Sequence, residues 1–497
     1  MIAVCIICFI IHIMETADRK KSHWTICLEC RGQGKITRGP SRKRRRLFEI
    51  ELEKYEMSGG KGAAPKPLRN NSDVCHGCAG SGLLSSEKDV PADSKKYPHI
   101  AIIGGGIGGV ALAVGCLHRG IPFTLYERDE SFDARSQGYG LTLQQASKAI
   151  EGLGIFSLDD GIASTRHVVH DPDGTVIDEW GLRKWRKGIV EKSAKRKNMH
   201  IARQKLRLLL LQELGDSKSL KWGRKLIGLS DNESGKVDLG FQAGEKQEIA
   251  EADLVVGADG IYSAVRKLVI GEEKNPLQYL GCIVILGICP IKSLGDIASP
   301  LFDSATVFQT VNGHERIYVM PYDKDAVMWQ VSFPMPESEA KKLSAQGAEA
   351  MKDEACKRLK WHDPIPQILA ATPESQITGY PVYDRKLFDP MVLREKGSVT
   401  LLGDAAHPMS PFKGQGANQA LLDALTLARK ISAECDQNPR WREIGIRKSV
   451  LNAFEEEMAE RSASKVEDSA KAARFLHSPK VLHDCSGPHD RRLRIDL

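Results

Sequence analysis

The stretch that decides the fold is residues 98–129, PHIAIIGGGIGGVALAVGCLHRGIPFTLYERD. An apolar run at 99–103 is typical of a buried β-strand and leads into the pattern Gly104-x-Gly106-x-x-Gly109. A helical segment follows over 110–119, and a second apolar strand ends at Glu127, with Arg128 next in the chain. Glycines in this context permit a tight turn and close approach of a pyrophosphate to a helix N-terminus. A carboxylate at the second strand end can accept from ribose hydroxyls, so the segment predicts a dinucleotide site for either FAD or NAD. An isolated glycine turn would not explain this placement between strand and helix.

Two later segments share this character. Residues 251–269, EADLVVGADGIYSAVRKLV, form an apolar strand that ends in Asp259-Gly260 and leads into a helix. Residues 396–424, KGSVTLLGDAAHPMSPFKGQGANQALLDA, contain a strand that ends in Gly403-Asp404 and a helix that starts after Gly416. Apolar residues recur along this helix at helical spacing from Ala417 to Ile431.

The three segments, in this order and at these separations, resemble the flavin-dependent aromatic hydroxylases. This is the single-component FAD monooxygenase family of para-hydroxybenzoate hydroxylase, and the chain also looks like its tetracycline-inactivating branch and the bacterial, plant and fungal relatives of that branch. The resemblance covers about residues 98–475. It implies an α/β fold with a Rossmann-like FAD-binding domain, a β-sheet substrate domain (about 165–200 and 276–385) and C-terminal helices. It also implies a monooxygenase that uses NAD(P)H and O2 to hydroxylate a small aromatic or polycyclic substrate through a flavin peroxide.

The resemblance suggests what the residues of the third segment do for a bound flavin. The Asp404 carboxylate can accept from ribityl hydroxyls of the flavin, and the unpaired N-terminal amides of the following helix carry partial positive charge. Gly414 and Gly416 let the backbone lie against a flat ring without a Cβ in the way. Pro411 lacks an N–H and shapes the turn beside the ring. We therefore expect bare backbone to face an electron-accepting ring there.

The resemblance carries individual positions over as well. Arg203, at the start of an amphipathic helix, matches a family arginine that contacts FAD. Arg135 matches a family arginine near the path by which the nicotinamide approaches, and Gln144 matches a polar residue that meets the flavin. Because the cofactor carries the chemistry, no catalytic side chain is named, and His407 is interpreted as structural. The expected cofactor-binding residues are Gly104, Gly106, Gly109, Glu127, Arg128, Arg135, Gln144, Arg203, Asp259, Gly260, Gly403, Asp404, Pro411, Gly414, Gly416 and Asn418.

A β-hairpin is predicted over residues 315–334, ERIYVMPYDKDAVMWQVSFP. Its side chains alternate with period two around a polar turn at 323–325. One face carries Tyr318, Met320 and Tyr322, and the returning strand offers Met328 or Trp329. We expect this hairpin in the substrate wall, although aromatic stripes are more often plain core.

Four of the twelve cysteines are patterned. Cys27-Leu-Glu-Cys30-Arg-Gly-Gln-Gly recurs as Cys75-His-Gly-Cys78-Ala-Gly-Ser-Gly. The pair of CxxCxGxG motifs resembles half of the zinc domain of J-domain chaperones, and two such turns can complete a tetrahedral zinc site. Two unrelated dithiols, or a redox pair, are the alternatives. We predict one structural Zn²⁺.

Composition and charge complete the division of the chain. Residues 1–97 hold 18 Lys and Arg against 11 Asp and Glu, which accounts for the whole net charge of +7. The rest of the chain has no net charge and so does not indicate nucleic-acid binding. The apolar residues 1–13 are too few to span a bilayer, and they could also come from a mis-assigned start of the coding sequence. We expect a cytoplasmic protein of undetermined oligomeric state, with a zinc-knuckle segment (1–84), a linker (85–97), the flavin body (98–475) and a flexible tail (476–497). Two other functions stay open: a related FAD oxidoreductase without oxygen insertion, and a non-catalytic flavin-fold adaptor with zinc knuckles.

Overall fold

The structure is a computed structural model of the chain. It describes residues 23–483, apart from positions 61, 63, 66–70, 135–138, 182–197, 216–217, 296, 298 and 304. Residues 1–22 and 484–497 also lie outside the description, as does the expected flavin contact Arg135. In the described part, no helix has both the length and the apolar character that a membrane span requires.

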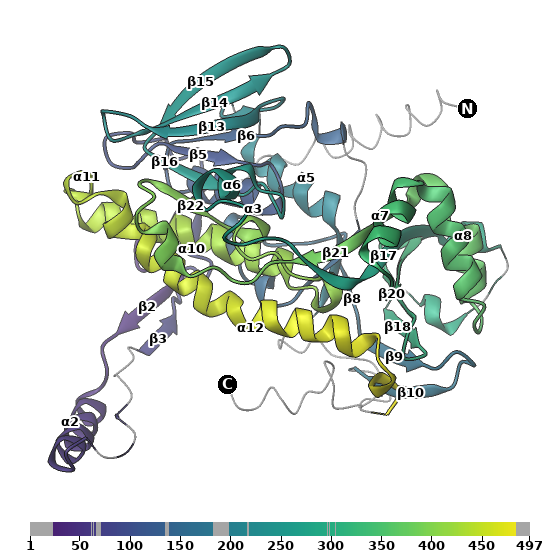
Figure 1. Cartoon of the computed structure of the whole chain (residues 1–497). Coiled ribbons are helices and arrows are strands. Elements are labelled where there is room, and N and C mark those ends of the chain that lie inside the picture. Colours follow the sequence, from purple (N-terminus) through teal and green to yellow (C-terminus); the bar gives the residue numbers. More distant parts are fainter. Residues whose placement is uncertain are drawn as a thin grey trace.

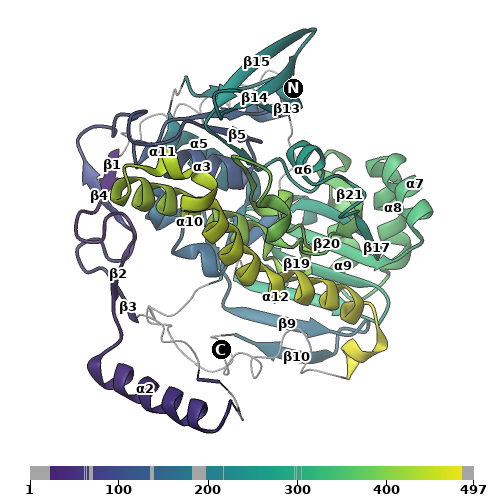
Figure 2. The same ribbon diagram turned by 60° about the vertical axis from the view of Figure 1, so that its left-hand side comes forward.

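The expected Rossmann-like unit is built on a five-stranded, all-parallel sheet in the order β12-β6-β5-β16-β22 (Figure 1). Helices α3, α5 and α10 lie on one side of this sheet, and an antiparallel three-stranded sheet lies on the other (Figures 1 and 2). Its central strands are continuous apolar runs because both faces are covered. The bounds are β5 Ile100–Ile103, α3 Ile107–Leu117, β6 Phe123–Tyr126, α5 Arg203–Leu214, β12 Leu220–Lys221, β13 Lys225–Asp231, β14 Val237–Ala243, β15 Lys246–Ala252, β16 Leu254–Gly257, α6 Ala264–Val269, β22 Val399–Leu401 and α10 Gly416–Gln437.

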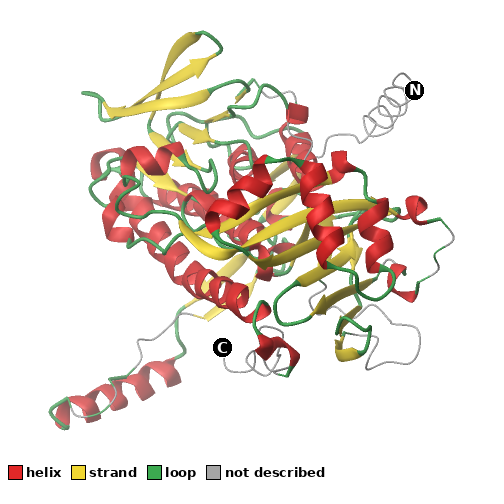
Figure 3. Cartoon of the chain, turned by 45° about the vertical axis from the view of Figure 1, so that its right-hand side comes forward, coloured by secondary structure: helices red, strands yellow, loops and turns green. Residues whose placement is uncertain are grey.

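A second, seven-stranded sheet has the order β10-β9-β18-β19-β20-β17-β21. Helices α7, α8 and α9 cover one face of it (Figure 3). The predicted hairpin is confirmed: β19 pairs antiparallel with β20 around the 322–325 turn. The bounds are β9 Arg166–His170, β10 Val176–Trp180, β17 Gln278–Pro290, β18 Thr306–Val311, β19 Arg316–Pro321, β20 Ala326–Pro334, α7 Glu337–Ala345, α8 Ala348–Arg358, α9 Ile365–Ala371 and β21 Ile377–Asp384.

A small sheet and two C-terminal helices connect these units. Strand β11 (Met199–Ala202), which overlaps the end of the range expected for the substrate sheet (about 165–200), instead pairs with β7 (Gly140–Leu143) and β8 (Ile162–Ala163). Helix α12 (Asn452–Leu476) runs from the parallel sheet to the seven-stranded sheet, whereas α11 (Trp441–Ile444) is one short turn (Figure 2). Residues 477–483, placed in the expected flexible tail, fold back so that His477 bonds Ser332 and Val481 is buried.

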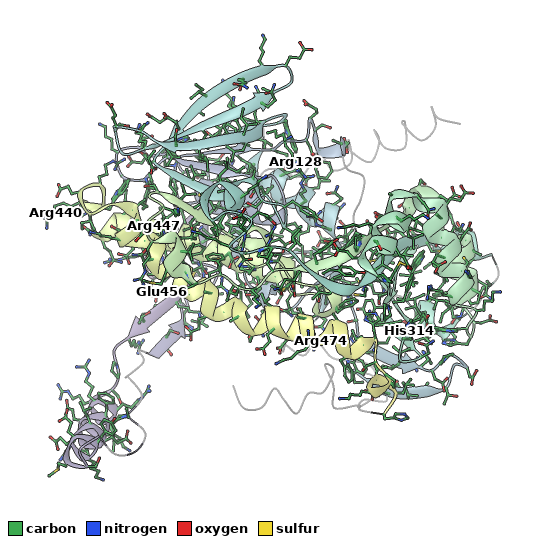
Figure 4. All side chains as sticks on the ribbon, in the orientation of Figure 1. Arg128, His314, Arg440, Arg447, Glu456 and Arg474 are labelled. Carbon is green, nitrogen blue, oxygen red and sulfur yellow. The ribbon has the colours of Figure 1, made fainter. Side chains whose placement is uncertain are left out.

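The N-terminal segment forms a small module of two two-stranded sheets, β1 (His23–Ile26) with β4 (Leu83–Ser86) and β2 (Lys35–Arg38) with β3 (Asn71–Val74). Helix α2 (Arg42–Met57) projects from it, has no buried residue, and its side chains stand clear of the body (Figure 4). The expected linker is held to the body, since the Arg442 guanidinium donates to the carbonyls of Ser94 (2.8 Å) and Lys95 (3.1 Å).

Candidate functional site

A cavity of about 1790 Å³ lies between the carboxyl ends of the parallel strands and one face of the seven-stranded sheet. This edge is where ligands of open α/β sheets bind. The structure brings thirteen of the sequence-predicted residues together on its walls. They are Gly104, Gly106, Glu127, Arg128, Gln144, Arg203, Asp259, Gly260, Gly403, Asp404, Pro411, Gly414 and Gly416.

The glycine-rich loop turns sharply between β5 and α3. Gly104 has φ +105°, a conformation that favours glycine, and Gly106 is the N-cap residue of α3. A Cβ on Gly106 would meet nothing within 4 Å, so open space lies beside the helix N-terminus. Gly109 is not on the cavity wall; a Cβ there would stand 1.9 Å from the carbonyl oxygen of Gly104. Its role is close packing of the helix on the turn.

Glu127 fixes this loop from the end of β6. Its carboxylate accepts from the backbone N–H of Gly105 (2.7 Å) and of Asp129 (3.0 Å). Arg207 donates to the carbonyl oxygen of Gly105 from the other side (2.7 Å). Sequence reasoning missed Arg207, although its spacing of four from Arg203 on one helix was a usable signal. Arg128, labelled in Figure 4, follows β6 and lines the same cavity.

The Asp259 carboxylate serves the protein itself. It accepts from Ser263 Oγ and from the backbone N–H of Ala264 (2.7 Å), at the start of α6. Burial raises the pKa of Asp259, while these hydrogen bonds act in the opposite direction. Arg266 on the same helix donates to the carbonyl oxygens of Ala405 (2.6 Å) and Ala406 (2.9 Å). The two flavin-type segments are therefore tied together by a buried arginine.

Asp404 presents its carboxylate to the cavity. Burial within the protein raises the pKa of Asp404, and the charges of His407 and Arg203 partly counter that rise. The preceding Gly403 has φ +58°, and its N–H donates to Asp423 (2.9 Å). The turn is thus bent so that an acidic side chain points into the cavity.

His407 is structural, as the sequence indicates. Its Nε2 lies 2.7 Å from Asp423 Oδ2, and both side chains are fully buried. Arg461 also bonds Asp423. Burial alone would lower the pKa of His407, but Asp423, with a smaller contribution from Asp404, offsets this and the pKa is raised.

Bare backbone faces the cavity at the start of α10, as expected. Gly414 has φ +60°, Gly416 is the first residue of the helix, and Pro411 begins the short turn before them. A Cβ on Gly414 would meet nothing within 4 Å. Gln415 donates from Nε2 to Gln144 Oε1 (2.8 Å), while its own Oε1 is buried without a partner in the described structure.

Asn418 requires a correction. The sequence places it among the cofactor contacts, but it is 1% exposed and does not line the cavity. Its Oδ1 accepts from the backbone N–H of Gln144 (2.8 Å) and Ala146 (3.2 Å). Its Nδ2 donates to the carbonyl oxygens of Thr142 and Gly414, both at 2.9 Å. A fully satisfied side-chain amide has no donor or acceptor left for a ligand, so the Asn418 side chain holds the wall rather than its contents.

The predicted hairpin forms the opposite wall. Tyr318, Met320 and Met328 line the cavity, whereas Trp329 points to the far face and donates from Nε1 to Thr372 Oγ1 (2.8 Å). Neighbouring residues of a strand point to opposite faces of the sheet, so only one of Met328 and Trp329 can line the cavity, and that residue is Met328. Tyr322 is not on the wall.

Arg316, which sequence reasoning missed, is the unusual group on this wall. It is 3% exposed and lines the cavity. Its Nε donates to Gln309 Oε1 (2.9 Å), but Nη1 has no partner within the described residues. Its guanidinium lies 4.9 Å from the ring centroid of Tyr318 and 5.9 Å from that of Phe412. No carboxylate of the described chain lies within 4.0 Å of it, so a buried cation faces the cavity uncompensated.

The four patterned cysteines come together in the N-terminal module. Cys27 Sγ lies 3.9 Å from Cys75 Sγ, Cys30 Sγ lies 3.7 Å from Cys78 Sγ, and all four sulfurs lie within 4.8 Å of one another. The two loops are equivalent: the N–H of Gly34 donates to Cys30 Sγ (3.1 Å), and that of Gly82 to Cys78 Sγ (3.2 Å). Four thiol groups thus surround one point.

Comparison with known proteins gives the following relatives. The model of the family described as "FAD binding domain" matches residues 97–442. The chain is 31% identical over 343 residues to aurachin C monooxygenase/isomerase of Stigmatella aurantiaca, covering 68% of this chain and 81% of that protein. It is 28% identical to 6-hydroxynicotinate 3-monooxygenase of Pseudomonas fluorescens, covering 79% and 93%. Among solved structures, Klebsiella pneumoniae HpxO complexed with FAD and uric acid matches with a TM-score of 0.64 at 21% identity, over 80% of this chain and 94% of that one.

Proposed function

This chain belongs to the FAD binding domain family, and on that basis we propose that it uses NAD(P)H and O2 to hydroxylate a small aromatic substrate that carries an acidic group. Its relatives include proteins named FAD-dependent monooxygenases, and the chain is an FAD-dependent oxidoreductase. The observation that carries the substrate class is the buried, unpaired Arg316 on the cavity wall.

The cavity residues fit FAD. Open space beside Gly106, Gly260 and Gly414, where a Cβ would meet nothing within 4 Å, provides backbone surface for a large ligand. The N-terminus of α3 suits the pyrophosphate, Glu127 a ribose, and Asp404 the ribityl hydroxyls. The N-terminal amides of α10 suit the electron-rich edge of the reduced ring. When bound, FAD would supply the electron transfer from the nicotinamide and the reaction with oxygen.

The buried positive charge of Arg316 favours an acidic substrate. A guanidinium taken out of water without a counter-charge is costly, and a carboxylate or an ionised phenol bound beside it removes that cost. Arginine also offers the planar donor pair that matches a carboxylate. The name of one relative, 6-hydroxynicotinate 3-monooxygenase, contains an aromatic carboxylate.

The neighbouring side chains suit the rest of such a molecule. Burial raises the pKa of Tyr318 to about 12, with Arg316 acting the other way, so its phenol stays protonated at neutral pH and can donate. Gln330 Nε2 is a second buried donor with no partner in the described part of the chain. Met320 and Met328 provide adaptable apolar surface for a ring.

The N-terminal module fits a structural zinc ion. Four thiolates at about 2.3 Å from Zn²⁺ in a tetrahedron lie about 3.8 Å apart, close to the sulfur separations of 3.7 and 3.9 Å. Cys27, Cys30, Cys75 and Cys78 would occupy all four positions, which suits structure rather than catalysis. The ligands come from two segments 48 residues apart, so the metal would hold them together.

The test is a product screen with the full chain reconstituted with FAD. Hydroxybenzoates and hydroxypyridine carboxylates are supplied with NADH or NADPH under ¹⁸O₂, alongside the carboxamide of each acid. We expect acids to stimulate nicotinamide oxidation and to yield products that carry one ¹⁸O by mass spectrometry, with carboxamides far poorer. Products without the label would identify the oxidoreductase that inserts no oxygen. Labelled products formed equally well from acids and carboxamides would refute the acidic-substrate proposal alone.

A further inference from the structure

We propose that Arg119 and Arg429 are the counter-charges of the metal-loaded cysteine cluster, so that zinc binding and docking of the N-terminal module on the FAD-binding domain are one coupled event. The inference rests on the structural zinc proposed above. It concerns residues of the body that neither the glycine motifs nor the flavin cavity accounts for.

The two arginines reach one loop of the module each. Arg119 Nη2 donates to the carbonyl oxygen of Gly32 (3.4 Å), two residues after Cys30. Arg429 Nη2 donates to the carbonyl oxygen of Ser81 (2.7 Å), three residues after Cys78. Both contacts therefore engage the backbone of the paired CxxCxGxG turns.

The fit around Arg429 is close. A Cβ on Gly34 would stand 2.9 Å from Arg429 Nη2, and the N–H of this glycine donates to Cys30 Sγ. Gln33 donates from Nε2 to the carbonyl oxygen of Arg429 (3.0 Å), so the contact is reciprocal. The guanidinium thus lies next to the residue that bonds a cluster sulfur.

The charges explain why two arginines are placed there. Arg119 is 2% exposed, Arg429 is partly buried, and the Nε of each lacks a partner among described residues. Within the described ranges, no carboxylate lies within 4.0 Å of either guanidinium. The Glu29 carboxylate instead accepts from Cys75 Sγ (3.1 Å) and from the backbone N–H of Gly77 (3.0 Å). Both guanidiniums bond the backbone of the loops that carry Cys30 and Cys78.

Metal binding supplies the missing negative charge. Four thiolates around Zn²⁺ leave a net double negative charge, whereas four protonated thiols carry none. Two guanidiniums are opposite in sign to that charge, and without it Arg119 is a buried cation and Arg429 a partly buried one, which proteins avoid. The loaded module is therefore held to the body by its charge, and the metal-free module is not.

The docking site lies behind the flavin cavity. Arg119 follows the end of α3 and Arg429 lies in the second half of α10, while the first residues of both helices line the cavity. An apolar contact adds to the charges: the Trp24 ring lies 4.6 Å from that of Phe156. The module thus supports from behind the two helices whose N-termini face the cavity.

The experiment uses the full chain with FAD bound. The test variant combines Arg119→Met with Arg429→Met, because methionine keeps the length of the side chain and removes its charge. It is compared with the double variant Arg119→Lys/Arg429→Lys, which keeps both charges. Arg442→Met is the matched control, because Arg442 holds the linker backbone at Ser94 and Lys95 without contacting the cysteine loops. Zinc content is measured by mass spectrometry, zinc affinity by competition with a chromogenic chelator, and module docking by limited proteolysis within residues 85–97.

We expect the double Met variant to bind zinc at least tenfold more weakly and to be cut faster in the linker, with the Lys variant and Arg442→Met close to the parent in zinc affinity. Stripping zinc from the parent should accelerate cleavage to the same degree. A folded double variant with parental zinc affinity would overturn the coupling, as would unchanged cleavage after stripping. If the parent itself holds no zinc after purification and addition of Zn²⁺, the zinc proposal fails instead.

Discussion

The side-chain oxygen of Asn418 lies 2.8 Å from the backbone nitrogen of Gln144, a residue 274 positions earlier in the chain. Through this bond the first turn of α10 holds the segment after β7, and both segments form wall of the same cavity. A residue that does not touch the cavity therefore sets the distance between two parts of it.

Replacing Asn418 by Ala tests this role. The change removes the side-chain partner of two N–H groups and two carbonyl oxygens, of which the N–H of Ala146 is buried, and a buried group left unsatisfied costs about 1–3 kcal/mol. We expect a melting temperature several degrees lower and weaker FAD binding, measured by thermal unfolding and flavin titration. Asn438→Ala, at the C-cap of the same helix, should change neither. Parental stability in Asn418→Ala would contradict the role.

Asp404→Ala tests the assignment of the cavity carboxylate. Loss of the acceptor for ribityl hydroxyls should cost about 1–3 kcal/mol, so FAD affinity should fall roughly tenfold or more. Asp389→Ala, which removes an N-cap that does not line the cavity, is the control and should bind FAD normally. Equal FAD affinity in the two variants would contradict the assignment.

Arg316→Met addresses substrate recognition. Removal of the buried guanidinium should weaken the binding free energy of acidic substrates by about 1–3 kcal/mol, which raises their KM by roughly tenfold or more. FAD affinity should stay unchanged. Carboxamides should become relatively better substrates because no unpaired cation is left. Steady-state kinetics on matched acid and amide pairs measure the change, and an unaltered preference would refute it.

The His407–Asp423 pair predicts a pH dependence of stability. The pKa of His407 is raised in the folded state, so its contribution is fully present below the unfolded histidine pKa and is lost as pH rises through the folded value. Burial raises the pKa of Asp423, but His407, Arg461 and the N–H of Gly403 together lower it by more, so the net pKa is lowered and the contribution of Asp423 is lost as pH falls through that low value.

The free energy of unfolding of the parent minus that of His407→Gln should therefore be largest in mildly acidic solution and shrink above the ordinary histidine range. Denaturant titrations over pH measure this difference. A difference that grows with pH in that range would contradict the pairing.

Deletion of residues 1–84 tests the independence of the body. The cavity wall begins at Ile103, so the shortened chain should still bind FAD. Its melting temperature should fall, because the deletion uncovers Arg119, Arg429 and Phe156. Flavin absorbance and thermal unfolding measure both, and loss of FAD binding by a folded shortened chain would contradict the expectation.

The sequence by itself determined every feature that depends on neighbours along the chain. Residues 98–129 define a strand, a turn and a helix because the glycines and the apolar period are local signals. The hairpin at 316–334 follows from alternation and a polar turn, and the clustering of four cysteines from two repeated turns. Each glycine-aspartate strand end lies at the cavity because carboxyl ends of parallel strands meet at one edge.

Tertiary structure alone decided which of two alternating residues faces the cavity and which polar groups remain unpaired. Met328 rather than Trp329 lines the wall because helices α7–α9 cover the other face of the sheet. The Asn418 side chain bonds backbone groups of the distant segment 142–146, and in the described structure Arg316 and Arg119 are buried, and Arg429 partly buried, without a carboxylate partner. Pairing and burial are relations between residues hundreds of positions apart, and no local pattern encodes them. A buried charge is visible only when the whole chain has folded around it.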